Sequence, residues 1–170
     1  MKKSKLLLTG AFVFAVNLVC GSAMAADTID ADDFVEDASA AGVAEIETAK
    51  LAIQKSTAAD VKAFAQSIIK DHTAANKELA TIASKKKLEV STEAELLNKA
   101  KAAVLKQREG ESFNAAYANN QVNAHQDAIE LFKKASASED KELAAFAVAT
   151  LPKLEHHLHL AKELAKTYPK

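Results

Sequence analysis

The chain has no tryptophan and only one cysteine, two prolines and four glycines among its 170 residues. Glycine and proline mark most tight turns, so their scarcity argues against folds built from many short strands joined by hairpins. Runs of alternating β-branched and aromatic residues, which are typical of strands, are also missing. Alanine is abundant, and alanine-rich helix faces allow helices to approach closely. The sequence therefore predicts an all-α protein.

The first 25 residues have the three parts of a secretory signal peptide. Basic residues lie within positions 1–5, an apolar stretch covers 6–19, and Ala23 and Ala25 form a small-residue cleavage site. The apolar stretch is shorter than the roughly 20 residues that a bilayer-spanning helix needs, and Asn17 interrupts it. We therefore expect cleavage after Ala25, a periplasmic location of the Gram-negative type, and no transmembrane anchor after cleavage.

The single cysteine, Cys20, lies inside this expected signal peptide. A mature protein that begins at Ala26 would then have no disulfide and no thiolate ligand for a metal. Lipid attachment at Cys20 is the lesser alternative, because Val19 stands where lipoprotein processing expects a small residue. We expect residues 26–170 to form one domain, stabilised by packing alone.

The expected mature chain carries a small excess of negative charge. Loss of three lysines in the signal peptide reduces 22 basic residues to 19, against 23 acidic residues, for a net charge of −4. Without a basic excess to replace counterions on phosphate, binding of nucleic acid is disfavoured. A protein partner or a homo-oligomer in the envelope is compatible with this composition.

Apolar residues that recur at every third or fourth position predict four long helices. Their expected ranges are 33–55, 57–86, 112–136 and 138–167. Asp32 or Asp33 is the expected N-cap of the first helix, and Thr57-x-x-Asp60 is a capping box for the second. Pro152 lies inside the fourth helix and is expected to kink it, because proline removes a backbone donor and crowds the preceding turn.

The connections between these helices predict the topology. Only one or two residues join the first two helices, which makes them antiparallel neighbours. The segment 87–111 is long enough for a crossover, with a short helix starting at Thr92 and Gly110 following it; the alternative is that this short helix extends the third long helix. Two antiparallel pairs joined by one long connection form the ferritin-like type of four-helix bundle.

Each long helix presents one titratable side chain to the predicted interior: Glu45, His72, His125 and His157. One carboxylate and three imidazoles suit a transition metal ion such as zinc, copper or iron. The alternative is a buried hydrogen-bond network without metal. In either case, Asp71 is a candidate hydrogen-bond partner for one of the histidines.

Two further histidines and the helix heights limit the metal hypothesis. In TLPKLEHHLHLAKEL, residues 150–164, the side chains of His156 and His159 are expected to point outward with Glu163, as a solvated face. Counted from the turn that joins their helices at 1.5 Å per residue, Glu45 and His72 differ in position along the axis by roughly 6 Å. His125 and His157 differ by roughly 12 Å unless the Pro152 kink or the loop shortens this difference, so the sequence does not secure a single site that contains all four inner residues.

Four segments resemble an exported bacterial family known as domain of unknown function 4142. They are AEIETAKLA (44–52), VKAFAQSIIKDHTAANKEL (61–79), FNAAYANNQVNAHQDAIELF (113–132) and ELAAFAVATLPKLEHHLHLAKEL (142–164). The resemblance implies a ferritin-like bundle in the cell envelope and implies no activity. The family's recurrent polar positions correspond here to Glu45, Asp71, His72, His125 and His157.

Ferritin-type di-metal proteins carry Glu-x-x-His on two helices. In this chain the positions three before the inner histidines are Ile69, Val122 and Leu154, so iron storage and oxygen activation are not expected. No nucleophile motif, phosphate loop or pair of acid/base carboxylates stands out. The sequence predicts a non-enzymatic envelope protein with a structural or stress-related role, and the alternative is an envelope metal-binding protein.

Overall fold

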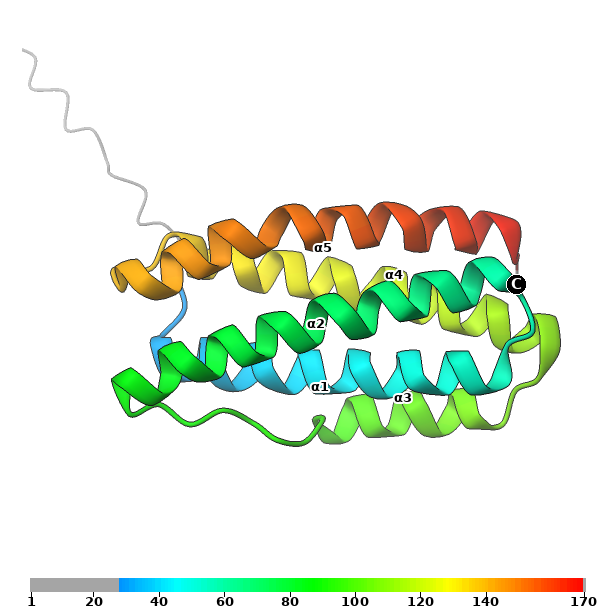
Figure 1. The fold of residues 1–170 in the computed structure, drawn as a ribbon, viewed down its shortest axis with the longest axis horizontal. Coiled ribbons are helices and arrows are strands. Elements are labelled where there is room, and N and C mark those ends of the chain that lie inside the picture. The colour runs from blue at the N-terminus through cyan, green and yellow to red at the C-terminus, as the bar shows by residue number, and fades with distance from the viewer. Residues whose placement is uncertain (1–27, 170) are drawn as a thin grey trace, which may run out of the picture.

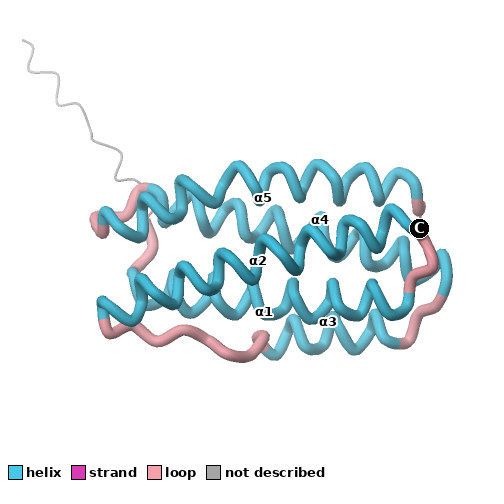
Figure 2. Tube along the Cα trace, in the orientation of Figure 1, coloured by secondary structure: helices cyan, strands magenta, loops and turns pink. Residues whose placement is uncertain are grey.

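A computed structural model describes residues 28–169, except for the side chains of residues 96 and 97. The expected signal peptide, with Cys20 and its cleavage site, lies outside the described residues. Figure 2 shows that the described part consists of helices joined by loops, and it contains no strand. Its five helices are α1 (Ala31–Lys55), α2 (Ala59–Lys86), α3 (Leu96–Lys106), α4 (Gly110–Ser136) and α5 (Lys141–Thr167). The all-α prediction is confirmed.

Four long helices lie side by side, and the short α3 runs along the outside of α1 (Figure 1). The most extensive contacts are between α1 and α2 and between α4 and α5, while α1 with α4 and α2 with α5 close the arrangement. The segment that contains α3 returns the chain along the length of the molecule, so α2 and α4 run in the same direction (Figure 1). A long connection between the second and third long helices is therefore confirmed.

Most of the expected helix starts are wrong by a few residues. The N-cap of α1 is Asp30 rather than Asp32 or Asp33, and α2 follows Ala58, which leaves the Thr57 capping box unformed. Helix α3 follows Glu95 rather than Thr92. Local start signals compete when several polar residues precede a helix, and tertiary packing selects among them.

One residue accounts for the start of each of the last two helices, α4 and α5. Gly110 does not end α3 but begins α4, with a φ of +53°, a left-handed conformation that glycine adopts without strain. Helix α5 begins at Lys141 because the side chain of Asp140 accepts hydrogen bonds from the backbone N–H groups of Glu142 and Leu143. The helix continues across Pro152 to Thr167.

The buried apolar residues form two separate clusters. One includes Phe34, Phe132 and Phe146, and the other includes Phe64 and Phe113. On every long helix a buried polar residue lies between the parts that belong to the two clusters. These residues are Glu45 on α1, His72 on α2, Gln121 and His125 on α4, and His157 on α5. The bundle interior therefore contains a polar layer near its middle.

None of the helices within residues 28–169 combines the length and the hydropathy that spanning a bilayer requires.

Candidate metal centre

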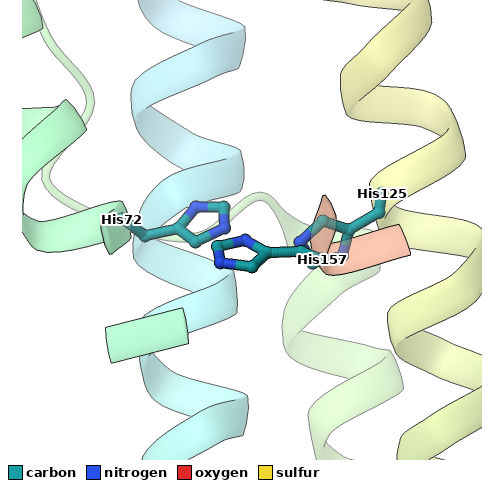
Figure 3. Close-up of side chains that lie close together, drawn as sticks. All are labelled: His72, His125 and His157. Carbon is teal, nitrogen blue, oxygen red and sulfur yellow. The ribbon is translucent and has the colours of Figure 1, made fainter. Parts of the chain in front are cut away.

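Three histidines from three helices meet in the polar layer. His72 on α2, His125 on α4 and His157 on α5 point toward one another (Figure 3). Their ring centroids are 5.5 Å (72 to 125), 5.7 Å (72 to 157) and 5.4 Å (125 to 157) apart. Their exposed fractions are 8 %, 1 % and 2 %, which confirms that all three face inward as the periodicity predicted.

The turn between α4 and α5 makes the height difference between His125 and His157 smaller than the predicted value of roughly 12 Å. The prediction placed the start of the last helix at residue 138, whereas residues 137–140 form the turn and α5 begins at Lys141. Counted from the helix ends, the two residues then differ by only roughly 7 Å along the axis. Their side chains close this remaining distance, and the rings lie beside each other.

In two of the rings, a hydrogen-bond acceptor determines which nitrogen carries the proton. His125 places Nδ1 2.9 Å from the backbone oxygen of Gln121, and His157 places Nε2 3.1 Å from Oδ2 of Asp71. A carbonyl and a carboxylate only accept hydrogen bonds, so these ring nitrogens donate and carry the proton. The other nitrogen of each neutral ring is then an acceptor with a free lone pair.

Each of the three rings has a buried nitrogen without a hydrogen-bond partner in the protein. These atoms are Nε2 of His72, Nε2 of His125 and Nδ1 of His157. For the last two residues, they are the nitrogens that the hydrogen bonds leave deprotonated. Buried polar atoms are nearly always paired, so these three ring nitrogens, which share the layer with unpaired side-chain atoms of Gln121 and Glu45, are candidate ligand atoms.

The electrostatics keep these imidazoles neutral. Burial, with a smaller contribution from the neighbouring rings, lowers the pKa of His72 to about 3 and that of His125 to about 4. Burial also lowers the pKa of His157, against the opposing effect of Asp71. At neutral pH all three rings are uncharged, and the neutral imidazole is the form that binds metal ions.

The spacing of the three rings fits one ion after a small adjustment. One nitrogen from each ring lies within 4.8 Å of the other two. An ion at the centre of such a triangle would be at most about 2.8 Å from each nitrogen, and zinc–imidazole bonds are about 2.1 Å. Each side chain therefore has to move by less than about 1 Å.

Glu45, the fourth predicted ligand, is not part of this cluster. Its Oε2 lies 3.9 Å from Nδ1 of His125, on the side of the ring that faces the backbone oxygen of Gln121. Burial raises the pKa of Glu45 to about 7, so the carboxyl group takes up a proton near neutral pH. The structure thus brings three of the four predicted residues together and leaves Glu45 behind one of them.

Asp71 connects the cluster to the surface. Its Oδ2 accepts the hydrogen bond from His157, and its Oδ1 lies 3.5 Å from Nζ of Lys153. Asp71 is thus the hydrogen-bond partner of a histidine, as the sequence suggested. The sequence reasoning missed the contribution of Lys153, although its i, i+4 spacing to His157 on one helix face is visible in the chain.

The outward-facing residues of α5 behave as expected. His156 and His159 are exposed, and Glu163 forms a surface ion pair with Lys166 at 2.7 Å. Among the histidine and acidic side chains of residues 28–169, the cluster described above is the one group with metal-ligand spacing.

The model of the family described as domain of unknown function (DUF4142) matches residues 19–164. No curated protein and no solved structure matches the chain.

Proposed function

Because the chain belongs to the DUF4142 family, whose description states no function, we propose a function from its own geometry: it binds one transition metal ion through His72, His125 and His157. One observation carries this proposal. Each of three rings from three helices has a buried nitrogen without a protein partner, and one nitrogen of each ring lies within 4.8 Å of one nitrogen of each of the others.

A hydrogen-bond network without metal accounts less well for this arrangement. In such a network each acceptor nitrogen would face a donor, because an unpaired buried polar atom costs on the order of 1 to 3 kcal/mol. Here the protons of His125 and His157 are directed away from the cluster, to Gln121 and Asp71. A cation satisfies the remaining lone pairs together, and outer hydrogen bonds of this kind are typical of metal-bound histidines.

The donor set limits the kind of metal. Three neutral imidazoles suit zinc or copper, whereas magnesium and calcium prefer oxygen ligands. The di-iron chemistry of ferritins uses bridging carboxylates, and Glu45 lies outside the cluster. Three protein ligands leave a fourth position of a tetrahedral ion for another ligand.

The proposal extends to architecture and location. The order of two helices, a crossover with a short helix, and two further helices supports a ferritin-like bundle. The signal-peptide pattern of residues 1–25 supports a periplasmic protein. Its role is metal binding rather than catalysis, since the sequence has no nucleophile motif and no pair of acid/base carboxylates.

Metal titration of the purified protein tests the proposal. We expect one equivalent of zinc or cobalt(II) per chain, with the intense visible absorption of a tetrahedral cobalt site, and a higher melting temperature with excess metal. A free metal concentration one hundred times the Kd stabilises the fold by about 2.7 kcal/mol.

Variants identify the ligands. His125→Ala and His72→Ala should lose the bound metal and the thermal shift, whereas the matched surface changes His156→Ala and His159→Ala should keep both. A wild-type protein that binds no metal refutes the proposal, as does full binding by the two inner variants. Circular dichroism of each metal-free variant shows that it is folded.

A further inference from the structure

The three histidines form one wall of a cavity of about 360 Å³. The cavity extends from the polar layer toward the apolar cluster that contains Phe132 and Phe146. Leu79 and Leu154 line the same apolar end. One end of the cavity is therefore lined by the three histidines, and the other end is lined by aromatic and aliphatic side chains.

Small side chains create this space. Ala75 on α2 and Ala128 on α4 line the cavity between its two ends, where larger residues would fill the interior. A water molecule needs about 30 Å³, and small-molecule sites begin at about 300 Å³. The cavity is thus far larger than an ion requires and has the size of a small organic ligand.

Charges around the cavity limit the ligand further. Acidic residues predominate, with Asp37, Glu78, Glu95 and Asp127 exposed at its rim, and Lys101 and Lys153 are the basic residues that line it. This excess of acidic side chains at the rim disfavours the entry of an anionic ligand. The apolar end disfavours a charged group of either sign.

We propose, on the basis of the metal site proposed above, that this cavity binds a small uncharged nitrogen heteroaromatic molecule. Its ring nitrogen takes the fourth position on the metal, and its apolar body lies beside Phe132 and Phe146. Phe132 and Phe146 pack against each other with their ring centroids 5.8 Å apart, and both line the cavity, so an aromatic ring in the cavity would add to this packing.

Ligand binding to the cobalt(II)-loaded protein tests this proposal, with 4-phenylimidazole as the probe. Calorimetry and the cobalt absorption spectrum should show that 4-phenylimidazole binds at least 10-fold more tightly than imidazole, and that benzoate binds more weakly than 4-phenylimidazole. Equal affinities of 4-phenylimidazole and imidazole overturn the proposal, as does tighter binding of benzoate. Equal binding of 4-phenylimidazole to metal-free protein overturns the role of the metal.

Cavity-filling variants separate this inference from the metal site itself. Ala128→Leu should keep one equivalent of cobalt and lose the preference for 4-phenylimidazole, and Ala75→Leu is a second variant of the same kind. The matched change Ala63→Leu, on the exposed face of α2, should keep both properties. A protein that binds no cobalt refutes the proposed function, whereas one that binds cobalt without this preference refutes only the inference about the cavity.

Discussion

His157 donates a hydrogen bond from Nε2 to Oδ2 of Asp71, with the two atoms 3.1 Å apart, and so joins α5 to α2. This contact fixes which nitrogen of His157 carries the proton. The deprotonated Nδ1 is buried without a protein partner, as a metal ligand requires. The carboxylate therefore acts as a positioning residue for the imidazole.

Removal of that carboxylate should weaken metal binding. We expect Asp71→Ala to lower the affinity for zinc by about 10- to 100-fold, because His157 loses its orientation and the basicity that the carboxylate provides. Asp71→Asn keeps an acceptor oxygen and should lie between Asp71→Ala and the wild type. Competition titration with a zinc chelator measures the affinities. Asp127→Ala removes an exposed charge at the cavity rim and serves as the control, and wild-type affinity in Asp71→Ala would contradict the prediction.

Acid should destabilise the metal-free protein. The pKa of His72 is about 3 and that of His125 about 4 in the folded protein, against about 6.5 when unfolded. Below pH 6.5 the unfolded chain takes up more protons at these sites, so the free energy of unfolding falls by about 1.4 kcal/mol per pH unit for each ring until the folded pKa is reached.

Glu45 acts in the opposite sense. Its folded pKa of about 7 exceeds the unfolded value near 4.5, so its protonation favours the folded state as the pH falls from 7 to 4.5. The destabilising effect of the two imidazoles is larger than the stabilising effect of the one carboxyl group. Urea unfolding at pH 7, 6 and 5 should therefore show that the free energy of unfolding falls as the pH falls. His72→Leu should reduce the slope by about one proton. Stability that stays level or rises on acidification would rule out neutral buried histidines.

Glu45→Gln tests whether Glu45 is a metal ligand or affects only the stability of the fold as a buried carboxyl group. The residue lies outside the three-nitrogen cluster, so we expect one bound metal ion and an affinity within about threefold of the wild type. At pH 8 the variant should be more stable by on the order of 1 to 3 kcal/mol, since a buried ionised carboxylate is replaced by a neutral amide. At pH 4.5 this difference should be small. Loss of the metal in this variant would show that Glu45 is a ligand.

Gly42 allows a close approach between α1 and α2. A Cβ atom at this position would clash with Oδ1 of Asn76, and Asn76 donates a hydrogen bond to the backbone oxygen of Ser39. We expect Gly42→Ala to destabilise the protein by about 1 kcal/mol, because the displaced amide loses this hydrogen bond and the gain in helix propensity does not fully offset the clash. Thermal unfolding measures the change.

The effect of this clash can be isolated by making Gly42→Ala in a protein that already carries Asn76→Ala. With the amide removed, Gly42→Ala should stabilise the protein by up to about 1 kcal/mol, as expected for glycine replaced within a helix. The sign of the effect should therefore reverse between the two backgrounds, and the same sign in both would show that the contact with Asn76 is not the cause.

Helix faces and the C-terminal ends of the four long helices could be predicted from the sequence, but the helix starts could not. The period of 3.6 residues identified the inward positions of His72 between Ile68 and Ala75, and of His125 beside Ile129. Thr57 has the chemistry of an N-cap, yet α2 begins at Ala59. An N-cap contributes only about 1 kcal/mol, which the packing of a whole helix can override.

The sequence by itself determined the all-helical class and the rotation of each long helix about its axis, because every residue turns the helix by a fixed angle and the apolar stripe must face the interior. Only the tertiary structure decided how far each helix slides along its neighbours. That shift depends on where the turns end and how side chains of adjacent helices interlock. It placed His125 and His157 side by side, grouped them with His72, and left Glu45 behind His125.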